Sequence, residues 1–115
     1  MIYNFSIQEI SKSRIYSINI ESPEHYILGH LTSYDWTSQK IKKLIESIKL
    51  TRDSSEEYRW QNEDLLIVSN KHGVFFIDLI SMRGNTIKEK QDLDLNHDTF
   101  IQFLEAFEKF VSKNS

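Results

Sequence analysis

The chain contains no cysteine, and it has only three glycines and one proline in 115 residues. Without thiols there is no disulfide framework, no thiolate zinc site and no cysteine nucleophile. A secreted domain of this size often needs disulfides as staples, so their absence favours a cytoplasmic protein. The scarcity of glycine also argues against a Gly-rich loop that cradles a phosphate.

Long hydrophobic runs are missing as well. No window approaches the roughly 20 apolar residues that cross a bilayer. The N-terminus lacks the basic region and apolar run of a signal peptide. We therefore expect a cytoplasmic location and no membrane partner.

Neither sign of charge dominates, with 14 basic and 17 acidic side chains and a formal net charge of −3. Nucleic-acid-binding domains usually carry a basic face, so the balance argues against a nucleic-acid partner. A mildly acidic protein is compatible with a basic protein partner.

Apolar and aromatic side chains are plentiful, at 39 % and 12 % of the chain. That is too much ring surface for a disordered chain, so we expect a packed core. The length fits one domain, which we expect to span residues 1–115.

The first third of the chain alternates between apolar and polar residues, as half-buried strands do. Residues 2–8 and 16–20 each show this period of two. Pro23 should end the second strand, because proline cannot donate to a ladder. The short apolar run at residues 26–31 predicts a third strand.

The period then changes to that of an amphipathic helix. Apolar residues at i, i+3, i+4 and i+7 form one stripe, which consists of Ile41, Leu44, Ile45 and Ile48. Either Asp35 or Thr37 is suited to cap the start of this helix.

The second half repeats the plan. We expect strands at residues 57–61, 65–68 and 74–80, with Gly73 in the connection between the last two. The strand that begins at Val74 lacks alternation, which predicts a central strand covered on both faces. A polar segment follows at residues 81–96. The strongest helical stripe comes last, capped by Asn96 or Asp98, and consists of Phe100, Phe103, Leu104, Phe107, Phe110 and Val111.

The predicted fold is therefore α+β, in the order βββα-βββα. A mainly antiparallel sheet of about five to six strands would be packed against two amphipathic helices.

The sequence shows no catalytic or metal-binding motif. The four histidines, His25, His30, His72 and His97, lack the spacing of a metal site. The acids from Asp92 start like a calcium loop, but His97 replaces the required glycine and Phe103 the required glutamate. We expect no enzyme, no metal and no cofactor.

Several short motifs resemble the YacL-like family of bacterial proteins, in the same order along the chain. They are Tyr3-x-Phe5, Gly29-His30, Trp60-Gln61, Leu93-x-Leu95, Phe100-x-Gln102, Ala106 and Phe110-Val111. The similarity spans most of the chain and departs at residues 83–91. It implies a small cytoplasmic α/β domain and no particular reaction, because the family is uncharacterised.

These features favour a non-enzymatic protein-binding module, specifically a bacterial immunity protein. Such a toxin inhibitor, as found in toxin-antitoxin and contact-dependent growth inhibition systems, would neutralise a basic toxin domain such as a nuclease. The expected partner-binding residues are acidic or aromatic, namely Glu56, Glu57, Trp60, Glu89, Asp92 and Asp94.

Two alternatives stay open. One is a YacL-like housekeeping protein associated with RNA or the ribosome, which would use the basic residues Lys40, Lys42, Lys43 and Lys49. The other is an enzyme whose site is assembled by the fold around carboxylates or His30. The oligomeric state also stays open.

Overall fold

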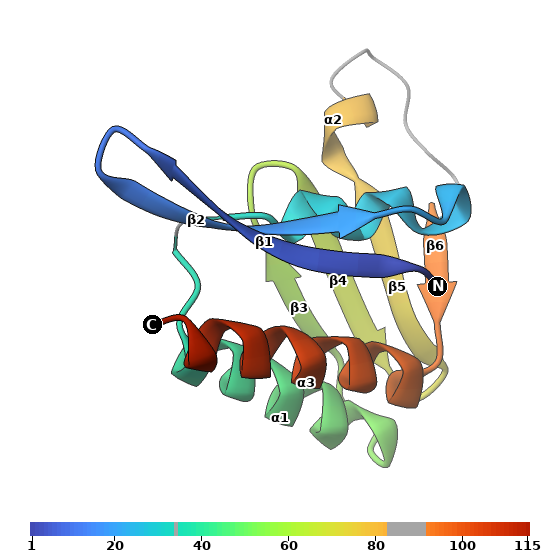
Figure 1. Ribbon diagram of the computed structural model, residues 1–115. Coiled ribbons are helices and arrows are strands. Elements are labelled where there is room, and N and C mark those ends of the chain that lie inside the picture. Colours follow the sequence, from blue (N-terminus) through green and yellow to red (C-terminus); the bar gives the residue numbers. More distant parts are fainter. Residues whose placement is uncertain (34, 83–91) are drawn as a thin grey trace.

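The computed structural model describes residues 1–33, 35–82 and 92–115 (Figure 1). Within these residues, strands and helices follow one another in an α+β order. The elements are β1 (Tyr3–Ile10), β2 (Ser13–Ile20), the 3-10 helix η1 (Pro23–Leu31), α1 (Ser38–Arg52), β3 (Tyr58–Gln61), β4 (Leu65–Asn70), β5 (Gly73–Asp78), α2 (Leu79–Met82), β6 (Leu93–Leu95) and α3 (His97–Lys113).

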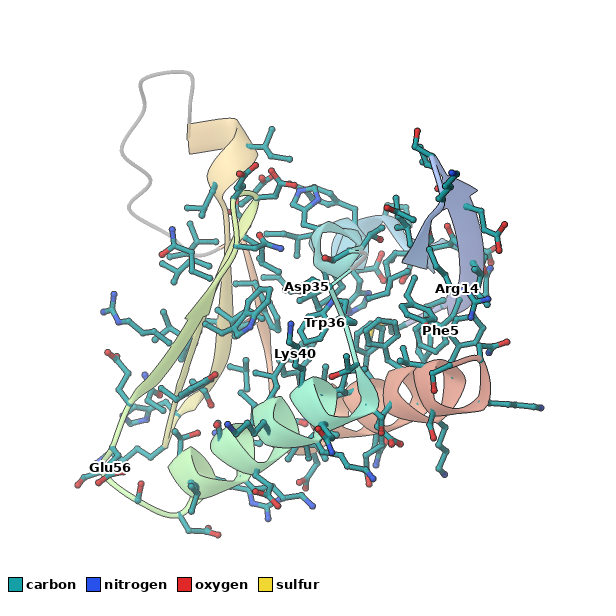
Figure 2. All side chains as sticks on the ribbon, turned by 90° about the vertical axis from the view of Figure 1, so that its left-hand side faces the viewer. Phe5, Arg14, Asp35, Trp36, Lys40 and Glu56 are labelled. Carbon is teal, nitrogen blue, oxygen red and sulfur yellow. The ribbon has the colours of Figure 1, made fainter. Side chains whose placement is uncertain are left out.

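The described strands form two antiparallel sheets. β1 and β2 make a two-stranded hairpin, and β3, β4, β5 and β6 make a four-stranded sheet in chain order. The two sheets lie on opposite sides of the core, α1 and α3 run side by side along one end, and η1 lies near the other (Figures 1 and 2). The fold class is therefore as predicted, but the strands divide into two sheets.

Aromatic contacts attach the hairpin to the last helix. Phe5 pairs with Ile18 across the hairpin. Its ring centroid lies 5.3 Å from that of Phe107 and 5.5 Å from that of Phe110. The alternation of β1 therefore buries one face of the hairpin against the apolar stripe of α3.

The third predicted strand, at residues 26–31, is wrong, because this segment is the 3-10 helix η1. Pro23 occupies the first turn, where its missing N–H costs nothing and its fixed φ suits a helix. Leu28 and Leu31 are both 0 % exposed. Residues three apart share one face of a 3-10 helix, so this spacing buries both leucines together.

The two long helices begin where the sequence predicts. Thr37 caps α1 by accepting a hydrogen bond from Lys40 N at 3.1 Å. Asn96 caps α3 by accepting from Thr99 N at 2.7 Å. In both cases a short polar side chain satisfies an amide that has no partner inside the helix.

A buried hydroxyl pair joins the end of α1 to β4. The oxygens of Thr51 and Ser69 lie 2.6 Å apart, and the two residues are 2 % and 0 % exposed. Thr51 also donates to the Ile48 carbonyl at 2.8 Å. Because the single Thr51 proton is used there, Ser69 is the donor to Thr51.

β5 has neighbours on both sides in the sheet, as predicted, but its two faces differ in burial. Val74 and Phe76 are buried in the core, whereas Phe75 and Ile77 are half-buried on the opposite face. No described helix or strand packs on that face, since α1, α3, η1 and the hairpin lie on the core side and the short α2 continues beyond the end of β5 (Figures 1 and 2). The expectation that both faces are covered is therefore not met by the described residues.

The strand β6 was not predicted from the sequence. Leu93–Leu95 lies in the segment expected to be polar and irregular, yet it pairs with β5 through Val74↔Leu95 and Phe76↔Leu93. The predicted strand at residues 26–31 is absent and β6 is present in its place, so the described residues contain six strands in all.

None of the helices among the described residues combines the length and apolar character that a bilayer crossing requires.

Candidate functional site

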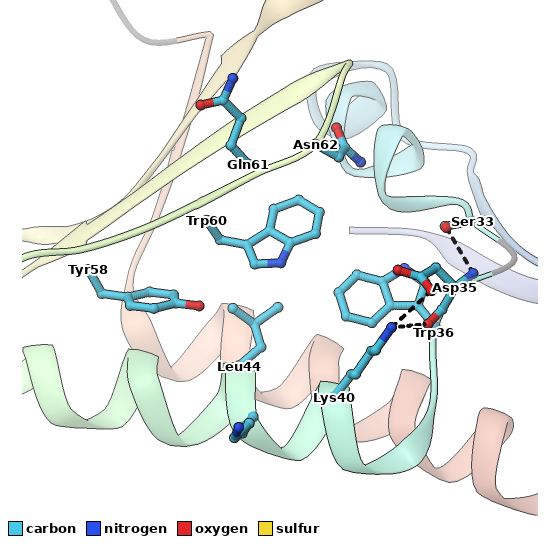
Figure 3. A pocket seen from close by; sticks show the side chains of 10 residues that line it. Ser33, Asp35, Trp36, Lys40, Leu44, Tyr58, Trp60, Gln61 and Asn62 are labelled. Atoms are coloured by element: carbon cyan, nitrogen blue, oxygen red, sulfur yellow. Dashed lines mark hydrogen bonds and ion pairs between the residues drawn. The ribbon is translucent and has the colours of Figure 1, made fainter.

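A pocket of about 340 Å³ opens between the N-terminal half of α1 and the strand β3 (Figure 3). Leu44 of α1 forms its floor, and the rings of Tyr58, Trp60 and Trp36 form its walls. Lys40 and Lys43 lie at its rim on α1. We call this group of six residues the aromatic pocket.

The strand period explains how two of these rings reach the pocket. Tyr58 and Trp60 are two residues apart in β3, so both point to the core side of the sheet. Trp60 then meets Trp36, which precedes α1, in a stack with 5.5 Å between ring centroids and 16° between planes.

Core contacts fix Trp36 in position. It is 7 % exposed, and its indole N–H donates to the Leu31 carbonyl at 2.6 Å. Its ring also meets Phe107 of α3 edge to face at 5.9 Å. The stack on Trp60 therefore rests on a ring that the fold itself holds in place.

One of the two lysines is already paired. Lys40 Nζ lies 2.9 Å from an Asp35 carboxylate oxygen and donates to the Asp35 carbonyl at 3.0 Å. Lys43 has no ion-pair partner among the described residues. The two lysines and the single acid leave this side of the pocket with a net positive charge.

A second polar group joins η1 to the end of β5. His30 Nε2 lies 3.3 Å from one oxygen of the buried Asp78. Tyr26 donates its hydroxyl to the other oxygen at 2.9 Å. This hydrogen bond, together with burial and the charges of Asp78 and Asp92, raises the pKa of Tyr26.

The contact between His30 and Asp78 links η1 to the end of β5. His30 Nε2 is closed off from solvent and makes no aligned hydrogen bond within the described residues. This nitrogen faces the Asp78 carboxylate. The cluster therefore anchors η1 on the sheet.

The outer face of the four-stranded sheet carries a compact set of apolar side chains. Leu66 lies opposite Ile77, and Val68 lies opposite Phe75, in neighbouring positions of β4 and β5. All four are half-buried and point away from the core. We call these four residues the outer apolar patch.

Charged side chains flank the outer apolar patch on both sides. Asp94 of β6 lies opposite Phe75 and is exposed. Arg59 of β3 lies opposite Val68 and pairs with Glu57 at 3.0 Å. With neighbouring strands about 4.8 Å apart, Arg59 and Asp94 are separated by roughly 14 Å, within the width of an ordinary protein interface.

The predicted partner-binding residues fall into separate places. Glu56, labelled in Figure 2, is exposed where the chain enters β3, and so is the next residue, Glu57. Asp94 is at the opposite edge of the sheet. Trp60 lies on the core side, in the aromatic pocket.

The remaining two predicted partner-binding residues are Asp92 and Glu89. Asp92 is half-buried, and its carboxylate accepts a hydrogen bond from the Asp78 backbone N–H at 2.7 Å, which gives it a structural role. Glu89 lies outside the described residues.

The basic cluster of α1 is largely balanced by α3. Lys42 pairs with Glu108 at 3.6 Å, and a shallow hollow between the helices collects three lysines and three glutamates. The residues are Lys42, Lys49, Lys109, Glu46, Glu105 and Glu108. This surface lacks the excess positive charge that phosphate backbones select.

Sequence reasoning missed the aromatic pocket, and it named His30 as a possible site residue without its partner Asp78. Trp60 was predicted to bind a partner and Trp36 lay outside the apolar stripes, but nothing in the sequence brought the two rings together. His30 and Asp78 are 48 positions apart (78 − 30), and only the fold brings them together.

Among the described residues, no group of three or more His, Cys, Asp or Glu side chains is arranged to hold a metal ion. Comparison with protein-family models, with curated proteins and with solved structures gave no match to this chain.

Proposed function

We propose that this chain is a non-enzymatic protein-binding module of the immunity type, which binds and neutralises a basic toxin domain such as a nuclease. The observation that carries the proposal is the outer apolar patch, an apolar set of side chains on a sheet face that no described helix or strand covers. Apolar patches rimmed by polar residues mark interaction sites on soluble proteins.

The residues of the patch argue for a partner rather than for an ordinary solvated face. A sheet face that meets water usually carries polar side chains. Here the face carries two adjacent apolar cross-strand pairs, Leu66 with Ile77 and Val68 with Phe75. A protein interface has the same layout, with an apolar centre that loses its water and a charged rim.

Charge favours a basic partner. The exposed acids Glu56, Glu57 and Asp94 around this face outnumber Arg59, which pairs with Glu57, and the chain carries a net charge of −3. Opposite charges on two proteins raise the rate of encounter, which matters for an inhibitor that must act before its toxin does.

The test is neutralisation of the toxin domain encoded directly upstream of this chain's gene. We expect co-expression of the chain to restore growth of cells that produce the toxin domain, and the purified proteins to form a one-to-one complex. Failure of the chain to bind or neutralise that domain contradicts the proposed function. Recovery of only RNA or ribosomal proteins in the same experiment would support the housekeeping alternative.

Three matched substitutions test the interface. Val68→Lys places a charge in the patch, Asp94→Lys reverses the rim, and Leu50→Lys places the same charge on α1, where Leu50 is 71 % exposed. We expect Val68→Lys to weaken binding at least tenfold, because central interface positions cost more than about 1.4 kcal/mol when disrupted. Asp94→Lys should mainly slow association at low salt, and Leu50→Lys should change neither.

Thermal unfolding of each variant separates loss of binding from loss of fold. If Val68→Lys is folded and still neutralises as well as Leu50→Lys does, the outer apolar patch is not the interface.

A further inference from the structure

The geometry of the aromatic pocket points to a second binding site, and we propose that it takes a small planar aromatic molecule carrying one anionic group. This site is on the core side of β3, whereas the outer apolar patch is on the other side of the sheet. The proposal is therefore independent of the toxin partner.

The size of the pocket sets the size of the ligand. A volume of about 340 Å³ lies at the lower end of the range of ligand-binding pockets, roughly 300 to 1,000 Å³. It suits one ring system with a short acidic arm. Leu44, 2 % exposed, supplies an apolar floor against which a flat ring can pack.

The two tryptophan walls are held in place by contacts within the fold. Trp60 stacks on Trp36, and Trp36 is held by its hydrogen bond to Leu31 and by its contact with Phe107. A rigid aromatic wall loses little conformational entropy on binding, so more of the stacking free energy is retained as affinity.

Three groups that can donate to a bound acceptor lie at the pocket. Among the described residues, the Trp60 indole N–H, the Tyr58 hydroxyl and the Lys43 ammonium make no hydrogen bond or ion pair. Figure 3 shows the first two facing the space above Leu44. By contrast, the Asp35 carboxylate is engaged by Lys40.

The amide of Asn62 is occupied as well. It donates to the His30 carbonyl at 3.1 Å and accepts from the Asp64 and Leu65 N–H groups, each at 2.8 Å. The centre of the pocket therefore offers donors and positive charge next to an aromatic wall, which is the complement of a flat ring with a carboxylate or phosphate.

Tryptophan fluorescence is a direct readout, because both tryptophans of the chain line this pocket. Two pairs of probes separate the possible sources of the anion. Adenosine 5′-monophosphate is compared with adenosine, and benzoate is compared with benzamide. We expect saturable quenching by one of the two anions and up to about fivefold weaker binding of its uncharged counterpart, since one exposed ion pair contributes up to about a factor of five.

Two charge reversals on the same helix provide the matched control. Lys43→Glu should weaken binding of the anion about tenfold or more, because it replaces an attraction by a repulsion. Lys49→Glu, an equal change outside the pocket, should leave the affinity unchanged. Trp60→Phe keeps a smaller ring and should bind more weakly than the wild type, and urea unfolding checks that each variant is folded.

The proposal is overturned by any one of three results. These are no saturable quenching by either anion at millimolar concentration, equal affinity for the anion and its uncharged counterpart, or equal loss in Lys43→Glu and Lys49→Glu. The Val68→Lys variant should bind the probe normally, so the outcome for this site does not depend on the outcome for the toxin partner.

Discussion

The buried hydroxyl pair between Thr51 and Ser69 allows a quantitative test of how α1 is held on the sheet. Thr51→Val keeps the shape of the side chain but leaves the Ser69 hydroxyl without its acceptor in a site that is 0 % exposed. An unsatisfied buried donor costs about 1–3 kcal/mol, so we expect a loss of about 2 kcal/mol in the free energy of unfolding.

Removing the other hydroxyl of the pair should lower the free energy of unfolding by less. Ser69→Ala removes the donor, but Thr51 keeps its own hydrogen bond to the Ile48 carbonyl at 2.8 Å. The expected loss is that of one ordinary hydrogen bond, about 1 kcal/mol. The double variant leaves no buried hydroxyl unsatisfied, so its loss should fall about 1 kcal/mol short of the sum of the two single losses.

Urea unfolding followed by far-ultraviolet circular dichroism measures all four proteins, with an unchanged slope showing that the denatured state is the same. Additive losses, agreeing within about 0.5 kcal/mol, would refute the coupling between α1 and β4. A larger loss in Ser69→Ala than in Thr51→Val would refute the assigned direction of the hydrogen bond.

Three further substitutions test single features of the fold. The pKa of Tyr26 is raised above 10.0, chiefly by its hydrogen bond to Asp78, so its contribution to stability is complete below about pH 10 and is lost as the pH rises through the folded-state pKa. Urea unfolding at rising pH should therefore show a steeper loss for the wild type than for Tyr26→Phe, and parallel curves would contradict this. Gly73 has φ +148°, and a Cβ there would lie 3.1 Å from the Leu95 carbonyl oxygen; Gly73→Ala should lower the unfolding free energy by about 1–3 kcal/mol, measured in the same way. Asn96→Ala should cost about 1 kcal/mol through loss of the α3 cap, whereas Asn96→Asp should keep most of the stability, and equal losses would show that the cap contributes nothing.

The parts of the fold that sequence predicts well are those in which burial follows a regular period. The apolar stripes of α1 and α3 each repeat through several turns, and their caps are short polar residues at the expected ends. The strand predicted at residues 26–31 was wrong because a short apolar run fits a strand and a helical turn equally well. The strand β6 was not predicted because a segment of three residues with two leucines is too short to establish any period.

The candidate sites were less predictable because they depend on distant residues. The outer apolar patch can be recognised only when it is known that no other element covers that face of the sheet. The apolar pattern of β5 alone indicates burial on both faces. The aromatic pocket requires Trp36 to meet Trp60 across the gap between a loop and a strand. Neither local propensity nor residue spacing contains that information.

The aromatic attachment of the hairpin to α3 has a consequence for folding during synthesis. β1 and β2 are complete once residue 20 has been made, and the sheet neighbours β3, β4 and β5 are also consecutive in the chain, so each can pair early. The ring of Phe5, however, packs on Phe107 and Phe110, about a hundred residues later. The hairpin therefore cannot complete the packing of Phe5 until α3 has been made, although β2 can already contact η1.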